Sequence, residues 1–132
     1  MTRFVITPDV ALRLAAGRAA IAEHHQLVAP TLLRSQLVTL LYQASRRGEL
    51  TKKEADRRLD YVRGLRLRLL GDRVLQRSAW AVADQLDWAD TFDAEYVALT
   101  QLQADALVTL DRRLADAVTH LVTVAPIEAL YR

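Results

Sequence analysis

The chain has 132 residues, the size of one domain, and we treat residues 1–132 as a single domain. Hydrophobic residues make up 52% of it and charged residues 26%, as in a globular protein with a buried core. It contains no cysteine, which excludes disulfides, thiolate nucleophiles and cysteine-ligated zinc. No apolar segment reaches the ~20 residues that a bilayer span needs, so we expect a cytoplasmic protein without membrane association.

The formal net charge of +2 is unevenly distributed along the chain. Between Arg46 and Arg77 there are eleven Lys or Arg residues against five Asp or Glu. From Ser78 to Asp111 there are seven acids and no Lys or Arg. This layout suits a metal site that receives a phosphate backbone, and it equally suits two solvated helix faces of opposite sign.

The N-terminal quarter predicts two short strands around a helix. The run Arg3–Ile6 is a β-type strand, and Pro8 suits the first position of a following helix of ten to fourteen residues. A weaker strand covers Gln26–Ala29 and stops at Pro30.

Two further helices are predicted between Thr31 and Gly71. The first runs from Thr31 to Arg46, and its apolar face comprises Leu33, Leu37, Leu40 and Leu41. In the second, Thr51 is the expected cap, and Glu54 three residues later completes a capping box. The apolar side of this second helix comprises Leu59, Val62, Leu65 and Leu69. The pair Val74-Leu75 is expected to form a very short strand.

The second half again alternates helices with apolar strands. Helices are predicted over residues 78–87 and 91–103, the latter with Phe92, Tyr96, Leu99 and Leu102 on one face. Strands are predicted at Ala106–Leu110 and Leu121–Ala125, with a short helix from Arg112 between them. The alternation indicates an α/β fold with a mainly parallel central sheet. We expect Trp80 and Trp88 to lie in the core or in an interface rather than to serve as platforms for base stacking.

Two aspartates stand out in the last third of the chain. Asp111 ends the strongest predicted strand, in ALVTLDRRLA, and Asp93 lies 18 residues upstream in the first turn of the preceding helix. Both carboxylates can meet at one end of the sheet, where their repulsion favours a shared cation such as Mg²⁺. Alternatively, Asp111 only caps the next helix and Asp93 only complements a helix dipole. Both interpretations remain open at this point.

The segment TFDAEYVALTQLQADALVTLDRRLA closely resembles the C-terminal signature of PIN domains, especially of VapC-like toxins. The matching positions are Asp93-Ala94, Tyr96 to Leu99 and Leu107 to Leu114. RFVITPDVALRL is similar to the opening strand and turn of the family, and VAPTLLRSQLVTLL to its second motif. The resemblance extends over nearly the whole chain.

The resemblance implies a Rossmann-like, PIN-like three-layer sandwich and an endoribonuclease that depends on Mg²⁺ or Mn²⁺. It also implies a homodimer and an antitoxin partner protein, as in type II toxin–antitoxin pairs. The family's site is a cluster of about four acids, and Asp93 and Asp111 fall on two of these positions. The other two hold the neutral residues Thr7 and Gln36. Asp9 is the nearest acid, and it completes a three-acid site if the turn at Pro8 redirects the chain.

Two functions are therefore compatible with the sequence. In the first, Asp9, Asp93 and Asp111 bind the metal and catalyse RNA cleavage. In the second, Thr7 and Gln36 mark a catalytically impaired PIN-like domain that binds RNA or a protein partner without efficient cleavage.

The basic segment supplies candidate RNA contacts, since Lys and Arg bind the phosphate backbone without reading sequence. These candidates are Arg57, Arg58, Arg63 and Arg66, and Arg112, which lies outside the segment, is a fifth. The alternative for the segment is a solvated, amphipathic surface helix. The apolar residues Leu65, Leu67, Leu69 and Leu70 exceed what one packing face needs, so a helix of an antitoxin or of a second subunit can cover the excess.

Overall fold

The computed structural model describes residues 1–132 and contains a five-stranded, all-parallel sheet in the order β3-β2-β1-β4-β5. Its strands are β1 (Thr2–Ile6), β2 (His25–Pro30), β3 (Leu67–Leu70), β4 (Ala106–Val108) and β5 (Val124–Ala125). The chain winds outward from β1 in both directions, so the topological switch point lies between β1 and β4. The predicted α/β fold class with a parallel central sheet is confirmed.

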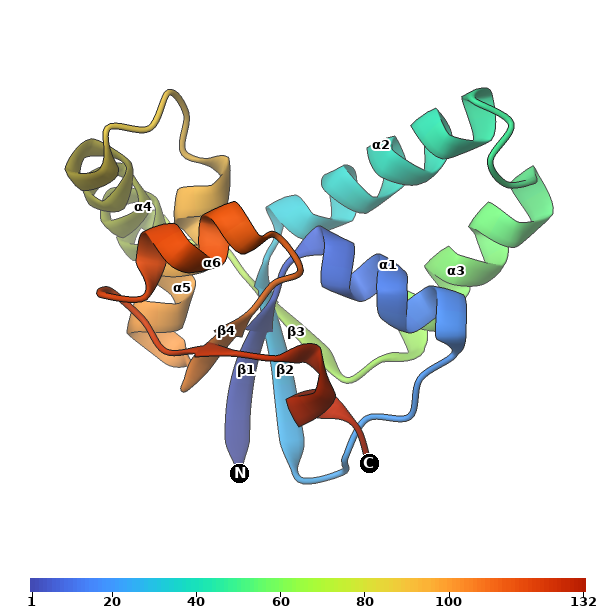
Figure 1. The fold of residues 1–132 in the computed structure, drawn as a ribbon, viewed down its shortest axis with the longest axis horizontal. Coiled ribbons are helices and arrows are strands. Elements are labelled where there is room, and N and C mark those ends of the chain that lie inside the picture. The colour runs from blue at the N-terminus through green and yellow to red at the C-terminus, as the bar shows by residue number, and fades with distance from the viewer.

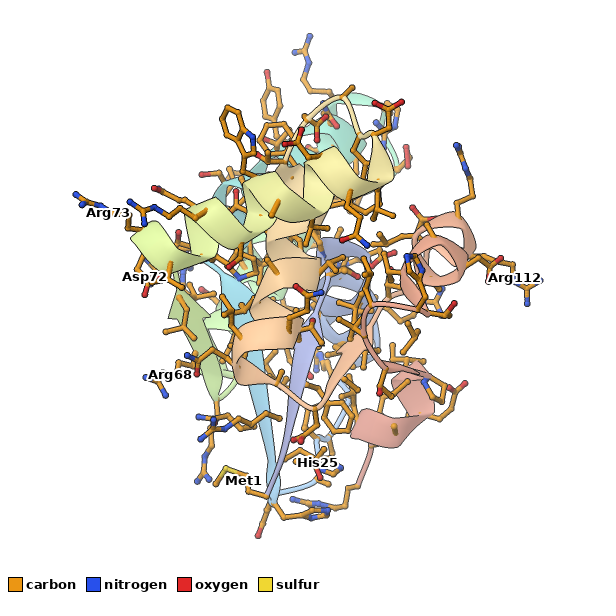
Figure 2. The ribbon with its side chains drawn as sticks, turned by 90° about the vertical axis from the view of Figure 1, so that its left-hand side faces the viewer. Met1, His25, Arg68, Asp72, Arg73 and Arg112 are labelled. Carbon is orange, nitrogen blue, oxygen red and sulfur yellow. The ribbon has the colours of Figure 1, made fainter.

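Helices cover both faces of this sheet and make it the middle of three layers. They are α1 (Pro8–Gly17), α2 (Leu32–Arg46), α3 (Lys52–Gly64), α4 (Arg73–Leu86), α5 (Phe92–Gln103), α6 (Arg112–Val118) and the 3₁₀ turn η1 (Ile127–Leu130). Helices α4 and α5 lie on one face and α1 on the other (Figure 2). Helices α2 and α3 extend beside α1 as an arm (Figure 1). None of the helices has the length and apolar character needed to cross a membrane.

The core is centred on β1, β4 and α5. The last three residues of β1 and all of β4 are buried, as expected for strands covered on both faces. In α5 six of the seven residues from Ala94 to Thr100 are buried, all but Glu95, and Tyr96 among them has no exposed surface. The elements that carry the acidic motifs are therefore the most deeply anchored parts of the molecule.

The segment around Gly71 folds differently from the prediction. Helix α3 ends at Gly64, and Leu67–Leu70 forms the edge strand β3 where the sequence predicted a continuing helix. The predicted strand at Val74-Leu75 is wrong as well, because both residues lie in α4. The free edge of β2 offers hydrogen bonds to residues 67–70, and the Asp72 carboxylate caps α4 by accepting from the Leu75 amide at 2.9 Å.

Two of the predicted strands were too long, and the predicted apolar faces of two helices included residues that are exposed. β4 stops at Val108, and only Val124–Ala125 of the last predicted strand pairs. Leu40, Phe92 and Leu102 are exposed, because the small residues Ala94 and Ala98 fill the inward side of α5 and Leu33, Leu37 and Leu41 that of α2. Trp80 is 69% exposed, so it lies outside the core, and the predicted alternative of an interface stays a prediction. Trp88 is half-buried against the core.

The start of α3 confirms half of the predicted capping box. The Thr51 hydroxyl accepts from the Glu54 amide at 3.1 Å, as expected for the cap. The Glu54 carboxylate does not accept a hydrogen bond from the Thr51 amide and instead forms ion pairs with Arg57 and Arg58.

We expect Gly71→Ala to lower the free energy of unfolding by about 1 kcal/mol or more, as overpacking does. A Cβ at Gly71 would lie 2.6 Å from the Thr31 hydroxyl oxygen, so Thr31 must shift. Gly64→Ala is the matched control, because a Cβ there meets nothing within 4 Å. Urea denaturation measures both, and Thr31→Ala in the same chain should recover most of the loss. An equal loss with and without Thr31→Ala would contradict this contact as the cause.

Candidate active site

The turn that follows β1 is tied to the end of β4. Thr7 is buried, and its amide donates to the Val108 carbonyl at 3.3 Å. Its hydroxyl donates to the Asp9 carboxylate. Asp9 also accepts from the amides of Val10 at 2.8 Å and Leu110 at 3.3 Å. Pro8 begins α1 between them, so the turn directs Asp9 toward the β4 end, as the three-acid interpretation requires.

Asp111 lies where the chain leaves β4 and begins α6. One of its carboxylate oxygens accepts from the amides of Arg113 at 2.9 Å and Leu114 at 3.2 Å. The capping interpretation of Asp111 is therefore confirmed. Its second carboxylate oxygen makes no hydrogen bond within the protein, so capping leaves one oxygen for another ligand.

Asp93 faces the other acids from the first turn of α5. Burial raises the pKa of Asp93, and repulsion from Asp111, Asp90 and Asp9 raises it further. The three predicted aspartates come from three different elements at the carboxyl edge of the sheet, and Asp9 and Asp111 are near enough to act on the charge of Asp93. Asp90, which the sequence did not single out, also repels Asp93. Its place three residues before Asp93 in the acidic stretch is the signal that pointed to it.

Gln36 is joined to the same region through Tyr96. The Tyr96 hydroxyl donates to the Gln36 side-chain oxygen at 2.6 Å, which connects α2 with α5. Burial raises the pKa of Tyr96, and the negative charges of Glu95, Asp93 and Asp9 raise it further. The phenol therefore stays protonated and donates. Gln36 is held as a neutral acceptor at the position where the resemblance implies an acid.

A shallow hollow of about 310 Å³ opens beside Gln36 between α2 and α5. It is lined by Leu32, Ser35, Gln36, Thr39, Leu40 and Phe92. Phe92 immediately precedes Asp93, so this hollow adjoins the acidic residues. Its apolar side chains are interrupted by hydroxyl and amide groups that can bind a polar ligand.

The oxygen atoms at this edge suit a hard divalent cation but do not form a complete cage. No three or more Asp, Glu or His side chains gather at the spacing of metal ligands. Asp9 and Asp111 each use at least one oxygen on backbone amides, whereas Asp93 accepts no hydrogen bond. Mg²⁺ usually takes one or two carboxylates and completes its shell with water and phosphate oxygens. The donor set fits such a loosely held ion.

Three of the five candidate RNA-binding arginines are paired within α3. Arg57 and Arg58 contact the Glu54 carboxylate at 2.7 and 2.8 Å, and Arg63 contacts Asp60 at 2.7 Å. Hydrogen bonds from Arg57 and Arg58 hold the pKa of Glu54 at about 2. The charges of these arginines are thus partly neutralised by acids of the same helix, while Arg66 and Arg112 make no ion pair.

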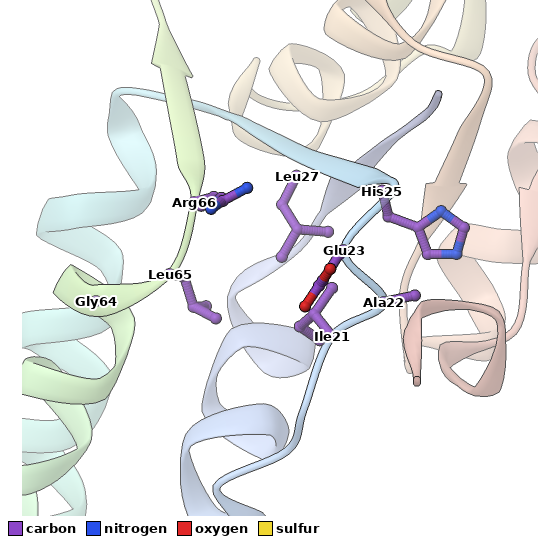
Figure 3. Close-up of a pocket in the computed structure, with 8 residues that line it drawn as sticks. All are labelled: Ile21, Ala22, Glu23, His25, Leu27, Gly64, Leu65 and Arg66. Atoms are coloured by element: carbon purple, nitrogen blue, oxygen red, sulfur yellow. The ribbon is translucent and has the colours of Figure 1, made fainter.

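A second hollow lies at the opposite, amino edge of the sheet (Figure 3). It has a volume of about 220 Å³, and its lining includes Glu23, His25, Leu65 and Arg66. Nδ1 of His25 is buried there without a hydrogen-bond partner. Arg66 precedes β3, so this predicted RNA contact lies at the end of the sheet away from the acids.

We expect Asp93→Asn to stabilise the protein at neutral pH, by less than about 1 kcal/mol because the side chain is partly exposed. A raised pKa in the folded state means that ionised Asp93 costs stability, and this cost grows as pH rises from the ordinary aspartate range through the raised pKa. The gain should therefore disappear below the ordinary aspartate range. Thermal unfolding between pH 3 and pH 7 measures it. Asp116→Asn, on the exposed side of α6, is the control, and an equal gain there would contradict the account.

Solved structures of other proteins are similar to this fold. No family model matches the chain, and no curated protein matches it. The crystal structure of PAE2754 from Pyrobaculum aerophilum matches with a TM-score of 0.78 and 22% identity, covering 96% of this chain and 90% of that one. The structure of VapBC2 from Rickettsia felis, bound to a DNA fragment from its promoter, matches with a TM-score of 0.67 and 11% identity, covering 94% and 98%. At these identities the likeness is one of fold, and the chain has the PIN-like fold that its C-terminal motif predicts.

Proposed function

We propose that this chain is a VapC-like PIN-domain endoribonuclease, the toxin of a toxin–antitoxin pair, which cleaves RNA with Mg²⁺ or Mn²⁺. The observation that carries the proposal is the placement of Asp9 and Asp111 after the neighbouring strands β1 and β4, where a hydrogen bond ties Asp9 to Leu110, with Asp93 near enough to be repelled by both. In open α/β sheets this crevice is where ligands bind. The fold shared with VapBC2 supports the choice of family.

Each of the three aspartates would have a different role in binding the ion. Asp93 would be the main direct ligand, because neither of its oxygens accepts a hydrogen bond. Asp111 would contribute the oxygen that is not used in capping α6. Asp9, fixed by the amides of Val10 and Leu110, would orient water or add a further ligand. A divalent ion bound there supplies a hydroxide nucleophile at neutral pH and stabilises charge on the phosphate.

Partner proteins belong to the same proposal. The neighbouring VapBC2 structure is of a two-component complex. On α2 the side chain of Leu40 is exposed, and Phe92 is exposed across the hollow beside Gln36. We propose that an antitoxin segment covers this apolar surface next to the acids, and that the chain forms a homodimer through another surface.

A second candidate function rests on Thr7 and Gln36. Both are neutral and both are hydrogen-bonded within the protein, Thr7 to Asp9 and Gln36 to Tyr96. A neutral amide cannot serve as a base and binds a divalent ion less strongly than a carboxylate. Under this candidate the chain binds RNA or a protein partner without efficient cleavage.

RNA cleavage by the purified chain tests the first function directly. We expect cleavage of a mixed RNA substrate with Mg²⁺ or Mn²⁺, its loss in EDTA, and a decrease of about 10²-fold or more in Asp93→Asn. Asp116→Asn, on the outer side of α6, should cleave like the unmodified chain. Cleavage that persists unchanged in Asp93→Asn, or none at any ion concentration tested, would contradict the proposal.

Gln36→Glu distinguishes the two candidates. The new carboxylate can still accept from the Tyr96 hydroxyl, so the fold should be retained, and circular dichroism checks this. If the site is impaired, Mn²⁺ affinity measured by isothermal titration should rise about tenfold or more, because a hard anionic ligand is added. If the site is already active, affinity and cleavage should change only modestly. Thr7→Asp in the same chain extends the comparison.

A further inference from the structure

One face of α4 presents an exposed aromatic ring beside two unpaired cations. Trp80 is 69% exposed, and it lines a surface groove of about 480 Å³ together with Arg73, Gln76 and Arg77. These residues are spaced three, four and seven positions apart, so they share one side of the helix. The inward side of α4 consists of Leu75, Ala79, Val82 and Ala83. Trp80 is therefore not needed to build the core.

The two arginines of this groove are free to bind an anion. Neither Arg73 nor Arg77 makes an ion pair, in contrast to Arg57, Arg58 and Arg63 of α3. The nearest acid on the N-terminal side is Asp72, and one of its oxygens is used to cap α4 at Leu75. Asp84 lies one turn beyond Trp80 at the other end of the face. The positive charge is thus concentrated in the first half of the helix.

Exposed tryptophan beside free arginine suits a single nucleic-acid strand. A nucleobase gains stacking energy on an indole face, and guanidinium groups bind the adjoining phosphates. From Arg73 to Trp80 the helix rises ~10 Å. That distance spans about three nucleotides of a stacked strand at ~3.4 Å each. A duplex does not fit this role, because its bases are already stacked and paired.

A protein partner is less well matched to this face. The centre of a protein interface is apolar and depleted in charge, whereas Trp80 lies beside Gln76 and Arg77. The one other large apolar side chain exposed on α4 is Val74. The composition therefore favours a polyanion over a second protein surface.

The groove lies on the same side of the molecule as the acids. Helix α4 begins directly after the carboxyl end of β3 and crosses the sheet face in the half opposite Met1 (Figure 2). The acids occupy the carboxyl edge of β1 and β4, which is the same edge because the sheet is all parallel. A strand held on α4 is thus on the side of the sheet from which the acids are reached.

We propose that Arg73, Gln76, Arg77 and Trp80 form a binding site for single-stranded nucleic acid, with a base on Trp80 and phosphates on the two arginines. That the strand is RNA rests on the proposed function, whereas the binding itself does not require cleavage. This site would hold substrate at a distance from the acidic residues.

Fluorescence anisotropy with a labelled twelve-nucleotide single-stranded RNA, in EDTA and at low salt, tests the site on the full chain. We expect Trp80→Ala to weaken binding about 5- to 100-fold, and Trp80→Phe to retain most of the affinity. Arg73→Gln with Arg77→Gln should reduce the slope of log affinity against log salt by about 1.4, or about 0.7 per phosphate contact. Tyr42→Ala, which removes another exposed aromatic, and Arg13→Gln, on the exposed side of α1 across the sheet from α4, are the matched controls and should bind like the unmodified chain.

The same assay with single-stranded DNA of equal sequence shows whether the site prefers RNA or DNA. Tighter RNA binding that depends on Trp80 supports an RNA site, and equal or tighter DNA binding that depends on Trp80 supports a site for single-stranded DNA. Equal affinities of Trp80→Ala and the unmodified chain would overturn the proposal, as would no binding of either strand at micromolar protein. A change of oligomeric state in Trp80→Ala by light scattering, with strand binding unchanged, would overturn it in favour of a protein interface. If the chain binds the strand through Trp80 but does not cleave RNA, this binding site is supported and the proposed nuclease activity is contradicted.

Discussion

The candidate site depends on the repulsion that Asp93 feels from Asp9 and Asp111, which backbone hydrogen bonds hold in place. Asp9 and Asp111 are fixed by amides of the segments that follow β1 and β4. Asp93 has no such donors, and its pKa is raised by burial and by its acidic neighbours. A fold selected only for stability would relieve this repulsion by losing one charge. A shared divalent cation relieves it while keeping all three, as functional sites often sacrifice stability for chemistry.

The rest of the structure fixes this arrangement in place. β1 and β4 are adjacent, and their carboxyl-terminal residues are buried on both faces, so the two strand ends can shift little relative to each other. Helix α5 carries Asp93 on one end and the buried Tyr96 one turn later. The hydrogen bond from Tyr96 to Gln36 then joins α2 to this frame. Site and core are thus built from the same elements, which leaves the exposed surfaces of α2 and α4 for partners.

Much of this was predictable because the strongest sequence signals lie on the central elements. The apolar runs before Thr7 and before Thr109 predicted β1 and β4. The spacing of Asp93 and Asp111 predicted that both lie at one end of the sheet. The edge strand β3 was missed because Leu-Arg-Leu-Leu fits a helix as well as a strand, and only the free edge of β2 decides between them. The sequence left open whether Trp80 lies in the core or in an interface, for a related reason. A tryptophan at helical spacing is buried or exposed according to tertiary packing, which local sequence does not encode.

The most direct test of the central claim is an NMR titration of the aspartate carboxyl carbons with Mg²⁺. If the acids form one cation site, the signals of Asp9, Asp93 and Asp111 should move along a single binding curve. The signal of Asp116, on the outer side of α6, should stay fixed. If Asp93 responds to millimolar Mg²⁺ no more than Asp116 does, the aspartates do not share an ion. Their convergence would then serve only to join α1, α5 and α6 at the end of the sheet.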